Sequence, residues 1–172
     1  MMKKLIVLIF LIGNTYYGYS QGLKTPTLIK APAWINGIWK LVSVENIYPD
    51  GNKVYPYGQH PKGLLIIDTT GIYSLQIFKA ERITVLSGDK NKCTPEENAA
   101  LVQGSNSHFG RYSIDETDQT VTFNIEYASF PNWNFNKQKR SYSYKNNTFQ
   151  YVVTNTTQGG ESVVAQVTWR KD

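Results

Sequence analysis

The 172-residue sequence is poor in the residues that form disulfides and metal sites. It contains one cysteine, Cys93, and two histidines, His60 and His108. A single cysteine excludes an internal disulfide, and two histidines without spaced acids or cysteines do not make a zinc motif, so we expect no metal and no cofactor. We interpret Cys93, in the polar stretch GDKNKC, as an incidental loop thiol, because the sequence does not show a basic side chain directed at it to lower its pKa.

The chain also lacks a large excess of one charge and a large cluster of like charges. The chain has 18 basic and 13 acidic residues, and the basic residues are scattered apart from a short cluster at Lys137, Lys139 and Arg140. Nucleic-acid binding proteins concentrate basic residues on one face or helix. We therefore expect no nucleic-acid partner.

Long hydrophobic runs are absent except at the N-terminus. Lys3 and Lys4 precede an apolar stretch that is too short to be a permanent membrane anchor, and small or polar residues follow it. This pattern predicts a signal peptide over residues 1–20, cleaved before Gln21, with an uncleaved anchor as the alternative. No cysteine stands at the cleavage point to carry a lipid, so we expect a periplasmic or secreted protein without stable membrane insertion. Its mature part has 16 basic against 13 acidic residues.

The remaining chain, about 150 residues, has the length of one domain. We expect an extended lead-in at residues 21–33 and one domain at 34–172. From Trp39 onward, short alternating runs are separated by turn residues, which is typical of an all-β sandwich or barrel. The predicted strands cover residues 38–47, 53–57, 63–68, 72–79, 108–115, 120–128, 137–145, 148–154 and 162–170.

One short helix interrupts the strands. Thr94 is a suitable N-cap, Pro95 fits the first helical position, and Glu97 stands three residues after the cap. This predicts a helix that ends near Gly104 and that either plugs one end of a barrel or lies at the rim of its mouth.

Several blocks of the sequence resemble the lipocalin-like domain family of small bacterial and fungal proteins. Gly37-Ile38-Trp39 and Trp169-Arg170 are similar to the lipocalin signature, and the similarity continues through GIWKLVSVEN, PYGQHPKGLLIIDTTGIYSLQI, TPEE, HFGRYSID and FPNWNFNKQKR. The resemblance implies an antiparallel calycin-type barrel of eight or nine strands with an interior pocket. It implies no reaction, because members of the family are mostly of unknown function.

The resemblance also implies structural roles and one departure. A first-strand tryptophan packs under a late arginine in lipocalins, so we expect Trp39, Trp169 and Arg170 to close the base of the barrel. The family commonly carries a histidine pair where this chain has Phe123 and Asn124, and chemistry that depends on that pair is not expected here.

The stretch SFPNWNFNKQKRSY, residues 129–142, forms the most informative hairpin. We predict strands at 121–127 and 138–144 around Trp133, with Glu126 opposite Arg140, so that both charges enter the interior as a pair. One face would then carry Thr122, Asn124, Glu126, Gln138, Arg140, Tyr142 and Tyr144. The other would carry Val121, Phe123, Ile125 and Tyr127. The aromatic residues of the connecting loop either cover the core or line a pocket mouth.

Three functional hypotheses follow. The first is an exported barrel that binds a small, largely apolar molecule, lined by Tyr57, Tyr73, Gln76, His108, Glu126, Trp133, Arg140 and Tyr142. The second is an isomerase, cyclase or hydrolase on the same barrel with Glu126 as acid or base and Tyr142 or His108 assisting. An ion pair between Glu126 and Arg140 argues against a general acid. The third is an interaction module or homodimer in which Val121, Phe123 and Ile125 face outward.

Overall fold

A computed structural model describes residues 31–158 and 160–171. The predicted signal peptide and residues 21–30 of the lead-in lie outside this part of the chain. No helix within the described residues combines the length and apolar character that crossing a bilayer requires.

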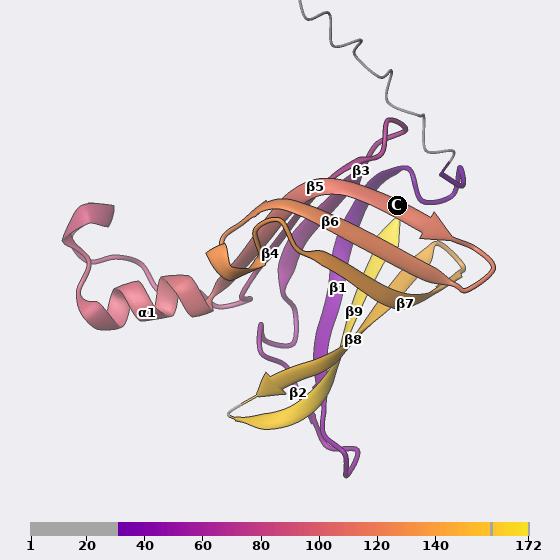
Figure 1. The fold of residues 1–172 in the computed structure, drawn as a ribbon. Helices are drawn as coiled ribbons and strands as arrows, with labels where there is room; N and C mark the ends of the chain where they lie inside the picture. The colour runs from indigo at the N-terminus through magenta and orange to yellow at the C-terminus, as the bar shows by residue number, and fades with distance from the viewer. Residues whose placement is uncertain (1–30, 159, 172) are drawn as a thin grey trace, which may run out of the picture.

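Eight antiparallel strands form a closed barrel (Figure 1). Each strand pairs with the next along the chain, and the last strand pairs with the first, which leaves no open edge in the barrel. A ninth strand of two residues, β2 (Lys53–Val54), pairs with the far end of β1. The barrel strands are β1 (Gly37–Ile47), β3 (Lys62–Ile67), β4 (Ile72–Phe78), β5 (Ser105–Asp115), β6 (Thr120–Ala128), β7 (Lys137–Lys145), β8 (Thr148–Gln158) and β9 (Glu161–Lys171).

The predicted strands are confirmed, with one exception. The run at 53–57 contributes only the two residues of β2, because Pro56 cannot donate to a ladder and the chain turns at Tyr55. Aspartates at the turns act as predicted: the Asp68 carboxylate accepts hydrogen bonds from the backbone N–H groups of Thr70 and Ile72, each at 2.9 Å.

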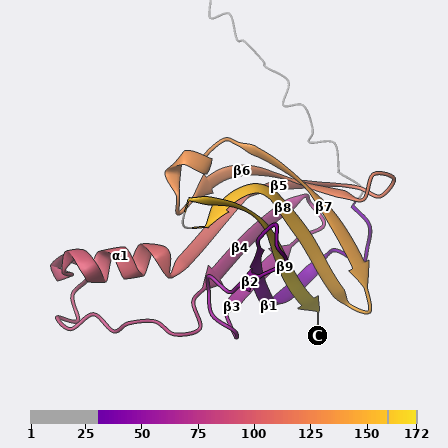
Figure 2. The ribbon, with the colours of Figure 1, turned by 90° about the horizontal axis from the view of Figure 1, so that it is seen from below.

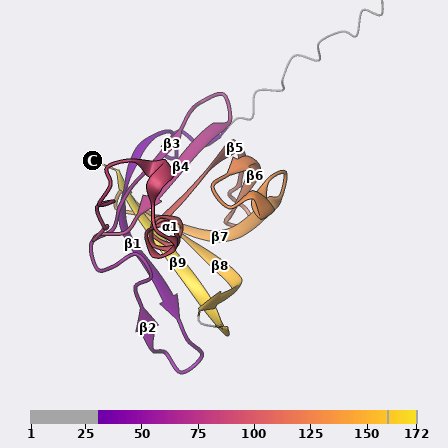
Figure 3. The same cartoon turned by 90° about the vertical axis from the view of Figure 1, so that its left-hand side faces the viewer.

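The predicted helix is α1 (Pro95–Gln103), and it begins with the expected capping box. The Thr94 hydroxyl accepts from the Glu97 N–H at 3.2 Å, and the Glu97 carboxylate accepts from the Thr94 N–H at 2.8 Å. None of its residues is buried. The helix projects from the barrel at the same end as the β6–β7 connection, as the two perpendicular views in Figures 1 and 2 show. Figure 3 shows it nearly end-on in front of the barrel strands.

The opposite end of the barrel is closed by packed aromatic rings. Trp39 and Trp169 are fully buried, the Trp39 indole donates to the Ile35 carbonyl at 2.7 Å, and Trp34 stacks on Tyr144 with ring centroids 4.3 Å apart. Trp39 and Trp169 thus lie together in the packed interior at this end of the barrel, as the sequence predicts. We call this end the base.

The cation at the base is Lys171, so the role predicted for Arg170 is wrong. Lys171 lies opposite Trp39 in the β1–β9 ladder, with its Nζ 5.3 Å from the Trp39 ring centroid. It also donates to the backbone carbonyls of Trp34 and Asn36. Because side chains alternate along a strand, a buried Trp169 turns Arg170 outward, where it is exposed.

The predicted register of the β6–β7 hairpin is also wrong. Val121, not Glu126, lies opposite Arg140, and the last pair of this ladder is Asn124 with Lys137. Val121, Phe123 and Ile125 are therefore buried inside the barrel rather than outward, and Glu126 is exposed.

Two local features account for the difference. A 3₁₀ turn, η2 (Pro131–Trp133), and the hydrogen bond from Ile125 N–H to the Asn136 carbonyl shorten the β7 side of the connection. A β-bulge at Glu126, opposite Phe109 and Gly110, turns the end of β6. Burying three large apolar side chains contributes roughly 1.5–3 kcal/mol each, which outweighs any benefit of an interior glutamate.

Candidate functional site

A cavity of about 270 Å³ occupies the half of the barrel away from the base. Its wall is mostly aliphatic and aromatic, with a few polar groups, which is the usual composition of small-molecule sites. We call it the interior cavity. It is lined by Val44, Asn46, Pro56, Tyr57, Leu75, Ile77, Asn106, His108, Trp133, Arg140, Tyr151, Val153, Thr156, Ala165 and Val167.

Arg140 brings the only formal charge of this lining, because no other lysine, arginine, aspartate or glutamate is among these residues. The strict alternation of β7 turns it inward between the exposed Lys139 and Ser141. Its guanidinium donates to the Gln138 side-chain carbonyl and lies 5.8 Å from the centroid of the Tyr151 ring. Burial lowers the pKa of Arg140, against the opposing effects of Tyr151 and Tyr73, but an arginine remains charged in proteins.

His108 is buried beside Arg140, and its Nδ1 lies 2.7 Å from the Tyr73 hydroxyl. Burial, together with the positive charge of Arg140, lowers the pKa of His108 to about 4. Burial also raises the pKa of Tyr73. Both groups are therefore neutral near pH 7, and one donates a single hydrogen to the other.

The remaining polar groups of the cavity are also neutral. Burial raises the pKa of Tyr151 to about 12, despite the nearby Arg140, and burial raises the pKa of Tyr57, against a hydrogen bond from Asn106. The Asn106 Oδ1 is buried and has no hydrogen-bond partner among the described residues. A buried acceptor without a hydrogen bond lowers the stability of the fold unless water or a ligand donates a hydrogen bond to it.

The cavity opens toward α1 through a second hollow of about 750 Å³, which we call the vestibule. Tyr57, Asn106 and Trp133 line both spaces, so the two lie directly beside each other. Leu101, Val102 and Gln103 at the end of α1 form one side of the vestibule, and Phe130 with Trp133 forms another. Of the two positions predicted for the helix, a plug or the rim of the mouth, the rim agrees with this arrangement.

The structure brings together five of the eight residues predicted to line the pocket. Tyr57, His108, Trp133 and Arg140 line the interior cavity, and Tyr73 contacts it through His108. Tyr142 lies at the base instead, with its ring centroid 5.4 Å from that of Trp34. Glu126 and Gln76 are on the outer surface, so the predicted Glu126–Arg140 pair does not exist.

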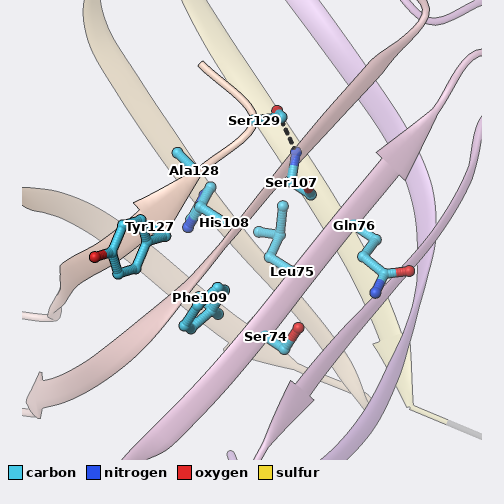
Figure 4. A pocket seen from close by; sticks show the side chains of 9 residues that line it. All are labelled: Ser74, Leu75, Gln76, Ser107, His108, Phe109, Tyr127, Ala128 and Ser129. Carbon is cyan, nitrogen blue, oxygen red and sulfur yellow. Dashed lines mark hydrogen bonds between the residues drawn. The ribbon is translucent and has the colours of Figure 1, made fainter. Parts of the chain in front are cut away.

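Gln76 lies beside a separate hollow of about 300 Å³ on the outer face of β4, β5 and β6 (Figure 4). The hollow is flanked by Phe109 and Tyr127, which are 46% and 55% exposed. The Ser107 N–H donates to the Ser129 hydroxyl at 3.0 Å within it. It does not enclose a ligand, because its aromatic residues are themselves half in solvent.

Several lining residues were missed in the sequence analysis. Tyr151 and Val153 on β8, and Ala165 and Val167 on β9, lie on the buried face of their strands. Their alternating apolar pattern was visible, but it does not distinguish a residue that fills the core from one that borders a cavity.

No group of three or more histidine, cysteine, aspartate or glutamate side chains is placed to hold a metal ion within residues 31–158 and 160–171. Cys93 is partly exposed, and its thiol donates to the Lys90 carbonyl at 3.3 Å.

Comparison with known proteins gives one match. No curated protein and no solved structure matches the chain significantly. The family model of the lipocalin-like domain matches residues 36–172, which include every strand of the barrel and both the interior cavity and the vestibule. The chain therefore belongs to the lipocalin-like domain family.

Proposed function

We propose that this protein binds a small, largely apolar molecule in the interior cavity. The observation that carries the proposal is the cavity itself: a barrel closed at one end by tryptophans and open at the other, with ten aliphatic or aromatic residues and five polar or charged residues in its wall. Eight-stranded barrels have room either for packed side chains or for one small ligand, and about 270 Å³ is unfilled here.

The residues proposed for the enzyme hypothesis do not lie together in the structure. Glu126 is exposed, Tyr142 lies at the base, and His108 is in the interior cavity, so these three groups cannot act on one substrate. The interaction hypothesis required Val121, Phe123 and Ile125 to face outward, but all three are buried. A homodimer stays a prediction that the molecular mass in solution would test.

We further propose that binding takes place after export, in a periplasm or outside the cell. The basic and apolar pattern of residues 1–20 supports this. N-terminal sequencing of the protein recovered from an expressing bacterium should begin at Gln21. An intact Met1 in the cytoplasmic fraction would contradict export.

The binding proposal is tested by blocking the cavity. Ala165 lines it and is 7% exposed, whereas its neighbour Val164 is 38% exposed on the outside of the same strand. Calorimetric titration with eight-carbon and aromatic ligands should give one saturable site for at least one of them. Ala165→Phe should weaken the affinity for that ligand at least tenfold, and Val164→Phe should leave the affinity unchanged. No saturable binding to the wild type, or equal binding by both variants, would contradict the proposal.

A further inference from the structure

We propose that the ligand of the interior cavity is a monocarboxylic acid whose carboxylate binds the Arg140 guanidinium. The inference rests on the proposed function and names the ligand class for that site.

The position of Arg140 follows from the fold. Its neighbours Lys139 and Ser141 are exposed, and its partner across the ladder, Val121, is fully buried. Since side chains of a ladder pair share one face of the sheet, the guanidinium is directed into the barrel.

The positive charge has no counter-charge within the described residues. The cavity lining holds no acidic side chain, no ion pair of Arg140 is present among the salt bridges of the described chain, and the one side-chain hydrogen bond of the guanidinium goes to the neutral Gln138. A charge removed from water without a partner costs several kcal/mol. A bound carboxylate would supply the missing partner.

The charge balance favours a monoanion. Arg140 is the sole cationic side chain among the described residues of the lining, because burial keeps the neighbouring His108 neutral. Tyr151 and Tyr73 are neutral as well and offer hydroxyl groups nearby. A phosphate dianion would bring a second negative charge that nothing in the cavity offsets. The planar guanidinium fork instead matches one carboxylate with two parallel hydrogen bonds.

The cavity volume limits the size of the acid. A volume of about 270 Å³ corresponds to roughly nine non-hydrogen atoms if each takes the liquid volume of a water molecule. Octanoate, with ten, is of suitable size when its tail reaches into the vestibule. The apolar wall formed by Val44, Leu75 and Ile77 suits an alkyl or aromatic body.

The test compares octanoate with 1-octanol, which has the same body without the charge. Dissociation constants are measured by calorimetry for the wild type and for Arg140→Gln, with Lys139→Gln as the matched control, because Lys139 carries the same charge one residue away on the exposed face. The wild type and Lys139→Gln should bind octanoate at least tenfold more tightly than octanol. Arg140→Gln should lose that preference, and Arg140→Lys should keep part of it.

Each other outcome contradicts a defined part of the account. Equal affinity of the wild type for octanol and octanoate would overturn the carboxylate assignment and leave the binding function standing. A preference that survives in Arg140→Gln would show that another group selects the anion. No binding of either ligand or of any other tested in the blocking experiment would overturn the binding function itself. Circular dichroism spectra of each variant establish that it is folded.

Discussion

At Arg140, the partner predicted from the sequence differs from the surroundings in the structure. This difference matters more for the proposed ligand than any other. The sequence pattern correctly places it inside the barrel, but the partner expected for it, Glu126, is exposed on the outer surface. A residue that looked like half of a structural ion pair lies instead at a cavity, without an ion pair among the described residues. The ligand proposed for this site depends on that difference.

An unpaired interior charge should reduce stability when no ligand is bound. Arg140→Met removes the charge and keeps a long apolar chain, so we expect the free energy of unfolding to rise by about 1 kcal/mol in urea titrations. Lys139→Met, on the exposed side, should change it by less than about 0.5 kcal/mol. A loss of stability in Arg140→Met would indicate that Gln138 and the Tyr151 ring already satisfy the guanidinium.

His108 should make stability depend on pH. Its pKa is about 4 in the folded protein and about 6.5 in the unfolded chain. Between these values the unfolded state binds more protons, so stability is fully present above pH 6.5 and falls as the pH drops toward 4, by about 3 kcal/mol in total.

The two histidines of the chain provide a matched comparison. His108→Gln should remove this part of the pH dependence, as measured by urea unfolding at pH 7 and pH 4.5. His60→Gln, at an exposed position, should retain it. Identical pH profiles for the wild type and His108→Gln would contradict a buried neutral His108.

At the scale of elements, α1 is held by its own capping rather than by packing. None of its residues is buried, and isolated helices of this length are marginal in water. Thr94→Ala should therefore increase hydrogen exchange of the α1 amides by about fivefold, while the barrel amides and the melting temperature stay unchanged. A melting temperature lowered by several degrees would show that the helix stabilises the barrel.

The β-bulge between β5 and β6 depends on Gly110. A Cβ atom there would lie 2.2 Å from the Asn124 carbonyl oxygen and 2.8 Å from the Glu126 nitrogen, both backbone atoms that cannot move aside. Gly110→Ala should cost about 2–3 kcal/mol more than Gly51→Ala, because Gly51 also has a positive φ but no heavy atom within 4 Å of the added carbon. Equal costs, measured by chemical unfolding, would contradict this role of the bulge.

The same region marks the limit of prediction from the sequence. Strand positions and the capping box of α1 follow from local patterns, and both are confirmed. The β6–β7 register depends on η2 and on the bulge at Glu126, two features that have no strong local signature. Since a shift by an odd number of residues turns a strand over, this one local error moved Glu126 to the wrong face.

At the scale of the whole molecule, the closed barrel and its family were predictable because turns and alternating strands recur along the entire chain. The open interior was not predictable. Whether Tyr151, Val153 and Ala165 fill the barrel or border a cavity depends on three-dimensional packing that no single strand encodes.

The proposed occupant of the interior cavity is a small acid whose carboxylate binds Arg140. The most direct measurement is a crystal structure of the protein with 8-bromooctanoate, in which the anomalous signal of bromine locates the tail. The account predicts bromine in the interior cavity or the vestibule, and carboxylate density within hydrogen-bonding distance of the Arg140 guanidinium. Bromine found only in the outer hollow beside Phe109 and Tyr127, or a cavity without ligand at saturating concentration, would contradict it.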